Sequence, residues 1–371
     1  MAARSTYLDW NATAPLRPEA AAAMAEALGH RGNPSSVHRF GRDARHALEA
    51  ARAQVAALAS AAPSEIVFTS GGTEANHLAL RGLTDRRILV SAIEHESVRQ
   101  AAPDAAIIPV TRAGIVDLDA LDRLLASEKQ PSLVSLMLAN NETGIIQPVA
   151  EAARIAHARG ALLHCDAVQA AGKLPLDRGR LGADLMTLSA HKLGGPPGVG
   201  ALVVAGELPL APLLTGGGQE RGRRAGTENL PGIVGFGAAC ESALARLADY
   251  RAVGALRDDA ERRLGAIARD AALYGDAVAR LPNTLCIAMP GVAAATQVMA
   301  LDLAGVMVSA GAACSSGKVR RSHVLDAMGV AAGEAECAIR ISLGWSTTAA
   351  DIDHLVEAWG ALYARTRASA A

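Results

Sequence analysis

A lysine and an aspartate stand at the ends of two apolar runs in the middle of the chain. Lys192 follows the run 185–189, and Asp166 is the last residue of the run 162–166. Open α/β sheets bind their ligands at the carboxyl ends of their strands, where both residues would lie. A lysine there could form a Schiff base, and an aspartate could keep a pyridine nitrogen protonated. This is the pair of groups that a pyridoxal phosphate enzyme needs.

A glycine-rich turn supplies a candidate anion site near this pair. Residues 70–76, Ser-Gly-Gly-Thr-Glu-Ala-Asn, follow an apolar run and open a helix pattern. Backbone amides at a helix N-terminus, together with the Thr73 hydroxyl, suit a phosphate group. A Gly-Gly pair between a strand and a helix is also ordinary turn chemistry. Taken alone, the motif therefore indicates a turn more often than a phosphate site.

One cysteine differs from the other four. Cys314 lies among small residues (309–317) without apolar periodicity, so core packing gives no reason for a thiol there. Lys318, Arg320 and Arg321 would favour the thiolate if the loop brings them close. The segment has the composition of an arm that delivers a nucleophile. The remaining cysteines fall in apolar patterns and are expected to be small core residues: Cys165, Cys240, Cys286 and Cys337.

A metal site and a disulfide framework are weaker interpretations of the same residues. His164 lies two residues before Asp166 on one predicted strand, but no further ligand accompanies the pair, so a structural role is favoured over a metal. The five cysteines form no CxxC pair, which argues against a zinc knuckle and against disulfides. Such cysteine usage indicates a reducing compartment, and we expect a cytoplasmic protein without a metal.

The elements that would position these residues follow an α/β pattern. Between about residues 65 and 204, short β-rich runs alternate with Ala-rich amphipathic stretches, as in βαβ units around a mostly parallel sheet. The many glycines and alanines favour close packing of helices on that sheet. Seven runs are expected to form strands, at residues 65–69, 87–91, 106–110, 133–137, 162–166, 185–189 and 200–204.

The remainder of the chain predicts a second, smaller α/β domain. A charged, Ala- and Leu-rich stretch at 241–271 has the spacing of one long helix or of two, interrupted near Gly254. This stretch is a plausible link between the domains. Strand and helix patterns then alternate, with strands expected at 284–289 and 338–343 and helices at 296–303 and 350–365.

The composition places the function in a local site rather than on a charged surface. The 371 residues include 36 Lys and Arg and 37 Asp and Glu, which gives a net charge of −1 and no field that would gather nucleic acid or an anionic membrane. Aromatic residues make up only 3% of the chain, too few for a surface that stacks bases. No stretch is suited to cross a membrane, and the N-terminus lacks the pattern of a secretory signal.

Short motifs follow one another through nearly the whole chain, and each is modest alone. They occupy residues 7–9, 11–13, 32–38, 69–76, 94–98, 139–144, 164–169, 189–192, 216–229, 309–317 and 340–342. Their joint order and spacing are specific. In this arrangement the chain resembles the cysteine desulfurases of the NifS/IscS type, within the class V aminotransferase-like pyridoxal phosphate enzymes.

The resemblance implies a role for each matched residue. Lys192 would bond the cofactor, pyridoxal 5′-phosphate, with Asp166 at its pyridine nitrogen and His95 stacked on its ring. Arg340 would clamp the substrate carboxylate, with Asn33 nearby. Further cofactor contacts would come from Gly72, Thr73, Asn141, Gln169, Ser189 and His191, and from Thr227 of the neighbouring subunit in a homodimer.

The implied activity is that of a cysteine desulfurase. L-cysteine would become L-alanine, and its sulfur would pass to Cys314 as a persulfide for delivery to an acceptor such as an iron-sulfur scaffold protein, in cluster assembly or thiolation. Lys192 and His95 would be the other catalytic residues. Two alternatives stay open: a selenocysteine lyase or aminotransferase of the same fold, for which Cys314 would be incidental, and a catalytically silent homologue that binds partners.

The implied fold is the α/β fold of the pyridoxal phosphate-dependent transferases, of the aspartate aminotransferase type. Its large domain, with a mostly parallel seven-stranded sheet, would span residues 15–250. The small α/β domain would combine residues 1–14 with 251–371 and carry the Cys314 loop.

Overall fold

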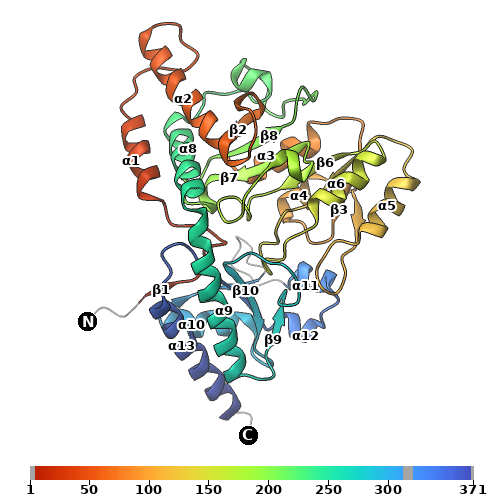
Figure 1. Ribbon diagram of the computed structural model, residues 1–371, viewed down its shortest axis with the longest axis vertical. Helices are drawn as coiled ribbons and strands as arrows, with labels where there is room; N and C mark the ends of the chain where they lie inside the picture. Colours follow the sequence, from red (N-terminus) through yellow and green to blue (C-terminus); the bar gives the residue numbers. More distant parts are fainter. Residues whose placement is uncertain (1–4, 312–320, 369–371) are drawn as a thin grey trace.

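The computed structural model describes residues 5–311 and 321–368, which form a larger and a smaller α/β part along the long axis of the molecule (Figure 1). The larger part is built on a seven-stranded sheet with the order β2-β8-β7-β6-β5-β3-β4. β8 pairs antiparallel with both of its neighbours, and all other pairs are parallel. The predicted sheet is confirmed, with strands β2 (Ile66–Thr69), β3 (Arg87–Ser91), β4 (Ala106–Ile108), β5 (Ser132–Ser135), β6 (Leu162–Asp166), β7 (Leu185–Ser189) and β8 (Gly200–Val204).

Both faces of this sheet are buried, which explains why its strands are mostly apolar on both faces and do not alternate strictly between apolar and polar residues. In β2, Ile66 and Phe68 belong to one hydrophobic cluster, while Val67 between them belongs to another. Successive side chains of a strand point to opposite faces, so the two clusters lie on opposite sides of the sheet. The helices of this part are α1 (Pro18–Ala27), α2 (Arg39–Leu58), α3 (Gly72–Arg81), α4 (Glu96–Ala101), α5 (Leu118–Ser127), α6 (Val149–Ala158), α7 (Arg178–Leu181) and α8 (Leu230–Ala245).

Glycines in α8 let this helix pack closely on α1 and α2. A Cβ atom at Gly237 would lie 2.8 Å from the Cα of Ala51 in α2, and one at Gly235 would lie 2.4 Å from the Cγ of Met24 in α1. Real Cβ atoms do not approach backbone so closely, so the contact at Gly237 needs a residue without a side chain, whereas the atom that a Cβ at Gly235 would meet belongs to the flexible Met24 side chain. The close helix packing that the composition predicts is thus present between helices, in the layer that covers one face of the sheet.

The smaller part has its own sheet and its own core. Its four-stranded sheet has the order β12-β13-β10-β9, and β1 pairs in parallel with β11. Leu8 and Trp359 lie in the same cluster, so the N-terminal segment packs against residues about 350 positions later in the chain. The elements are β1 (Thr6–Tyr7), α9 (Tyr250–Ile267), β9 (Ala272–Tyr274), β10 (Thr284–Ala288), α10 (Ala294–Leu303), β11 (Val306–Met307), β12 (Ser309–Ala310), α11 (His323–Ala327), α12 (Ala332–Ala335), β13 (Ala338–Ser342) and α13 (Ala349–Ala368).

The expected helix break near Gly254 is wrong. The chain leaves α8 after Ala245 and starts α9 at Tyr250, so the interruption lies before Gly254, which sits inside α9. A glycine within a helix costs about 1 kcal/mol relative to alanine. Here the apolar face of α9 is buried in the core of the smaller part through residues such as Val253 and Leu264, and this burial outweighs that cost.

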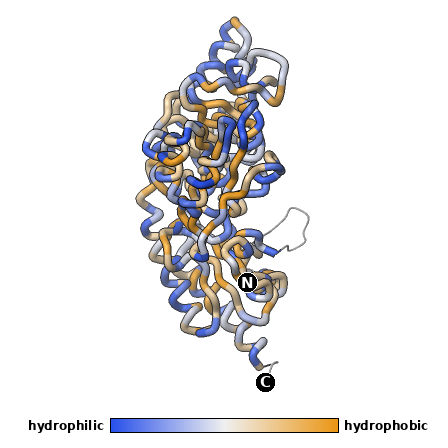
Figure 2. The backbone as a smooth tube through the Cα atoms, turned by 90° about the vertical axis from the view of Figure 1, so that its right-hand side faces the viewer, coloured by the Kyte–Doolittle hydropathy of each residue, from blue (hydrophilic) through white to orange (hydrophobic). Residues whose placement is uncertain are grey.

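Hydrophobic segments concentrate toward the inside of both parts, and hydrophilic ones gather along the outer turns (Figure 2). No helix within residues 5–311 and 321–368 combines the length and the apolar composition needed to span a bilayer.

Candidate active site

A cavity of about 540 Å³ lies beyond the carboxyl ends of β6 and β7, and the smaller part contributes residues such as Arg340 to its lining. Parallel strands that end at one edge bring side chains from distant parts of the chain together. The cavity is lined by most of the residues singled out in the sequence, namely Gly72, Thr73, His95, Asn141, Asp166, Gln169, Ser189, His191, Lys192 and Arg340.

Three of the predicted residues are not among those that line it. Asn33 is exposed, and its side-chain oxygen accepts a hydrogen bond from the Ser35 amide at 2.8 Å. Thr227 is exposed as well. Cys314 lies outside the described residues, between Gly311 and Arg321, both of which line the cavity.

Lys192 ends a short 3-10 turn that follows β7 directly. Its Nζ donates hydrogen bonds to the carbonyl oxygens of Asn11 and Ala12, both at 2.7 Å. Burial, and then the positive charge of Arg340, lower the pKa of Lys192 to about 8. At pH 7 about 10% of such amines are unprotonated, against about 0.03% for an ordinary lysine. The site therefore supplies a nucleophilic amine near neutral pH.

Asp166 is held in one orientation at the end of β6. One carboxylate oxygen accepts a hydrogen bond from the Asn76 side-chain amide at 2.8 Å, and the other accepts one from the Val168 backbone amide at 3.0 Å. The side-chain oxygen of Asn76 is buried and has no partner. The carboxylate is thus fixed in a cavity wall, where it suits a cationic or protonated nitrogen.

His95 caps the start of α4 and lines the cavity. Its Nδ1 accepts a hydrogen bond from the Ser97 amide at 3.1 Å. In a neutral imidazole the proton is then on Nε2. Burial lowers the pKa of His95, so the neutral ring prevails near pH 7. The helix start thus fixes both the position and the tautomer of this side chain.

A smaller hollow of about 240 Å³ adjoins the cavity at the start of α3, where Gly71 provides no side-chain cap. Free backbone amides at a helix start attract anions. A Cβ atom at Gly72 would lie 3.2 Å from Val168 Cγ2, so a larger residue would crowd this hollow.

The side chains that line the hollow include His191 and several hydroxyl groups. Burial lowers the pKa of His191 to about 4, which leaves it neutral. Hydroxyl groups of Ser70, Thr73 and Ser189 complete a lining that suits a phosphate group.

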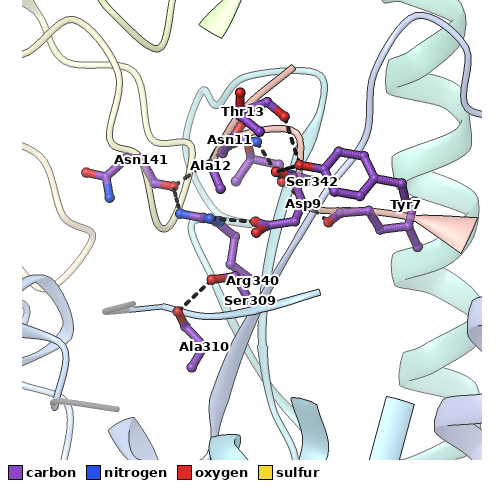
Figure 3. A network of polar contacts seen from close by, with 12 residues as sticks. Tyr7, Asp9, Asn11, Ala12, Thr13, Asn141, Ser309, Ala310, Arg340 and Ser342 are labelled. Atoms are coloured by element: carbon purple, nitrogen blue, oxygen red, sulfur yellow. Dashed lines mark hydrogen bonds and ion pairs between the residues drawn. The ribbon is translucent and has the colours of Figure 1, made fainter. Parts of the chain in front are cut away.

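Arg340 comes from β13 of the smaller part and lines the cavity, and Figure 3 shows its contacts with Asp9 and Asn141. Its guanidinium forms an ion pair with Asp9 at 2.7 Å and donates to the carbonyl oxygen of Asn141 at 3.0 Å. The Nε atom of Arg340 is buried and has no hydrogen-bond partner. A guanidinium with an unused buried donor at a cavity wall is suited to a carboxylate ligand.

Several contacts here were not assigned a role from the sequence. Asn76 orients Asp166, Asp9 holds Arg340, and the Asn11 carbonyl accepts from Lys192. Asp9, Asn11 and Asn76 all belong to the motifs named in the sequence analysis. The motifs therefore indicated that these residues matter, but not which side chains they contact. His323, whose Nε2 lies 2.9 Å from the Glu94 carbonyl oxygen, also lines the cavity and belongs to no motif.

The other histidine and the other cysteines have structural surroundings. His164 is buried, with Nδ1 2.9 Å from the Ser135 hydroxyl and Nε2 2.9 Å from the Thr187 hydroxyl, so both nitrogens are occupied. Within the described part of the chain, no three His, Cys, Asp or Glu side chains gather as a metal-binding group. As expected, the four cysteines with apolar neighbours are buried: Cys165, Cys240, Cys286 and Cys337.

Comparisons with known proteins agree over nearly the full length. The family described as aminotransferase class-V matches residues 6–355. The chain is 48% identical over 366 residues to a cysteine desulfurase of Cereibacter sphaeroides, covering 95% of this chain and 94% of that protein. It is 40% identical over 369 residues to the cysteine desulfurase IscS of Dictyoglomus turgidum, covering 95% and 93%.

Solved structures extend this similarity to the fold. A NifS-like protein from Rickettsia africae superimposes with a TM-score of 0.91 at 36% identity, over 97% of this chain and 99% of that one. SspA, solved in complex with cysteine, gives a TM-score of 0.77 at 28% identity, over 91% and 99%.

Proposed function

The chain belongs to the class-V aminotransferase family, as a cysteine desulfurase of the NifS/IscS type, and from this premise we propose how its cavity works. The cavity binds pyridoxal 5′-phosphate and L-cysteine and produces L-alanine, while the sulfur passes to Cys314. The observation that carries the proposal is the meeting of Lys192, Asp166 and Arg340 around one cavity. They provide an amine of lowered pKa, an oriented carboxylate and an incompletely bonded guanidinium.

The residues present fit the cofactor. The hollow at the start of α3 offers uncapped amides and hydroxyl groups for a phosphate, and Gly72 leaves the space open. The carboxylate of Asp166 and the amine of Lys192 line the adjoining cavity. Bound there, pyridoxal phosphate supplies an electron-accepting ring that acidifies the Cα position of an amino acid.

Each residue of the chain then has a defined task. Lys192, partly unprotonated near pH 7, bonds the cofactor and carries the Cα proton of the substrate on Nζ. Asp166 holds a proton on the pyridine nitrogen. Arg340 binds the substrate carboxylate with the N–H groups of its terminal nitrogens that Asp9 and Asn141 leave free. The Nε2 of His95 is the nitrogen left to exchange a proton inside the cavity.

Cys314 is the nucleophile in this proposal. Gly311 lines the cavity three residues before it. Its thiolate attacks the substrate sulfur, an S–S bond forms and the C–S bond breaks. The carbon keeps the electron pair and takes up a proton to give the methyl group of alanine, so no external reductant is required for this step.

The proposal extends to partners and compartment. The exposed Thr227 reaches the phosphate site of a second copy in a homodimer, and Asn33 assists the substrate carboxylate. The persulfide passes to an acceptor such as an iron-sulfur scaffold protein, for cluster assembly or thiolation, in the cytoplasm. The proposed division is a large domain of residues 15–250 and a small domain of 1–14 with 251–371.

The test is a single assay on purified protein. Its visible spectrum is recorded, L-cysteine and a thiol reductant are added, and alanine, sulfide and keto acid are measured together. We expect a visible cofactor band, and alanine and sulfide in equal amounts. A keto acid in place of alanine would indicate an aminotransferase. In a parallel mixture that contains L-selenocysteine instead, turnover of selenocysteine alone would indicate a selenocysteine lyase. The absence of a cofactor band would indicate a catalytically silent partner-binding protein.

A further inference from the structure

A buried lysine that the proposed chemistry does not use lies behind Gln169. Lys173 is only 4% exposed. Its Nζ donates hydrogen bonds to the backbone carbonyl of Gln169 at 2.9 Å and to the side-chain oxygen Oε1 of the same residue at 3.1 Å. Burial, and then the positive charges of Lys192 and Arg340, lower the pKa of Lys173 to about 7. A buried amine with cationic neighbours is costly, so packing alone does not account for a lysine here.

The contact with Lys173 decides which way the amide of Gln169 points. The Nζ of Lys173 donates to Gln169, so the atom of the amide that faces it is the oxygen. The amide nitrogen then lies on the other side, where Nε2 donates to the carbonyl oxygen of Asn11 at 3.0 Å. The same carbonyl accepts from Lys192 Nζ at 2.7 Å. Lys173, Gln169 and Lys192 are thus joined by one chain of hydrogen bonds through Asn11.

This chain leaves one hydrogen-bond donor for the cavity. The nitrogen of a carboxamide carries two hydrogens, and the Asn11 carbonyl takes one of them. Gln169 lines the cavity, so the second N–H is available to a ligand there. A hydrogen bond donated to the oxygen of an amide also polarises it and strengthens its N–H groups as donors.

We propose that Lys173 is a positioning residue that acts through Gln169: it locks the amide so that an N–H, and not the oxygen, meets an electron-rich oxygen of the ligand bound in the cavity. The inference rests on the proposed function, because that ligand is the cofactor. Lys173 does not line the cavity, so its effect on the bound ligand is exerted through Gln169.

The test is a double-mutant cycle with Lys173→Met and Gln169→Leu. Methionine keeps the length of the side chain and removes the donor. The readouts are the pyridoxal phosphate concentration that half-saturates the apoprotein, the visible absorption maximum, and kcat and KM for L-cysteine. We expect Lys173→Met to raise the half-saturating concentration about tenfold, since a charge-assisted hydrogen bond and the orientation that depends on it are lost. We also expect it to shift the absorption maximum and to lower kcat more than it raises KM.

The double variant carries the decisive comparison. If Lys173 acts through Gln169, the double variant matches Gln169→Leu alone, because the amide that Lys173 orients is already absent. If Lys173 only stabilises the turn, the two effects multiply, and the inference is overturned. Gln169→Glu is a second variant that keeps an oxygen toward Lys173 but lacks the N–H, so it should behave like Gln169→Leu.

Two controls separate the possible failures. Lys129→Met removes a lysine that is exposed and does not line the cavity, and it should leave every readout unchanged. Thermal unfolding of each apoprotein measures whether Lys173→Met folds, and circular dichroism of the folded variant should match that of the parent. If the parent protein binds no cofactor and releases no alanine, the proposed function fails. If the parent does both and Lys173→Met is indistinguishable from it, only the present inference fails.

Discussion

The two sides of the cavity differ in how completely their polar groups are bonded. On the sheet side, both oxygens of Asp166 accept hydrogen bonds, and His95 has its tautomer fixed by the start of a helix. On the opposite side, the Nε atom of Arg340 is buried without a hydrogen-bond partner, and the guanidinium forms an ion pair with Asp9. A buried unpaired donor costs free energy until a ligand satisfies it. The carboxylate on the sheet side is therefore fully bonded within the protein, whereas the guanidinium on the opposite side keeps donors that an anion can use.

The largest effect is expected from removing the amine on the sheet side. Lys192→Ala should lower alanine formation by at least about 1,000-fold, because it deletes both the covalent anchor and the group that carries the proton. The fold should persist, since the side chain bonds two carbonyls but fills no core. Reduction with borohydride followed by mass spectrometry checks the anchor. A covalent cofactor adduct that persists in the variant would assign the linkage to another residue.

A smaller loss is expected from neutralising the carboxylate on the same side. Asp166→Asn keeps the shape but loses the charge, and it brings an amide donor toward the donor of Asn76. An opposite charge nearby shifts a pKa by about 1 to 3, so we expect turnover to fall about 10- to 1,000-fold. Steady-state alanine assays measure it, and turnover close to that of the parent would refute the role given to Asp166.

Removing the guanidinium tests the opposite side. Arg340→Ala should raise KM for L-cysteine about 10- to 150-fold, which corresponds to losing a charge-assisted contact worth roughly 1.5 to 3 kcal/mol. The cofactor spectrum should change little, because the groups that would hold the cofactor lie on the sheet side. If the variant is saturated at the same cysteine concentration as the parent, the carboxylate site lies elsewhere.

The smallest expected effect is a change in KM for Asp9→Asn, and its direction distinguishes the two sides of the cavity. Asp9 competes with an incoming carboxylate for Arg340. Asp9→Asn should therefore lower KM for L-cysteine about threefold, as expected for a partly exposed ion pair. Arg340→Ala raises the same constant, so the two variants move it in opposite directions. An increase in KM for Asp9→Asn would mean that Asp9 positions Arg340 more than it competes with the substrate.

Much of this arrangement could be predicted from the sequence, for a physical reason. The strands of the large sheet are buried on both faces, so each is a short apolar run, and all seven runs are strands in the structure. The residues at their ends, Asp166 and Lys192, follow directly from those runs. The interruption near Gly254 was misplaced, because tertiary burial of α9 overrides the weak local preference of one glycine.

Contacts between segments that are distant in the sequence could not be predicted from the apolar runs. Lys173 looks like an ordinary solvated lysine in the sequence, and only the fold buries it behind Gln169. The pairing of Asp9 with Arg340 joins residues more than three hundred positions apart. Motif membership marked Asp9 and Asn76 as notable but carried no information about their partners. His323 carried no signal, since a single histidine outside a motif has many uses.

The central claim is that sulfur leaves L-cysteine for Cys314, and one measurement tests it directly. Cys314→Ser replaces the thiol by an alcohol that is almost wholly protonated near neutrality and forms no persulfide. Single-turnover mixtures with L-cysteine are analysed for alanine and for protein-bound sulfur by intact mass, beside Cys165→Ala as a control for a buried cysteine. We predict that Cys314→Ser still binds the cofactor and changes its visible spectrum with L-cysteine, yet releases neither alanine nor bound sulfur, while Cys165→Ala retains both. Sustained alanine and sulfide production by Cys314→Ser would contradict the account.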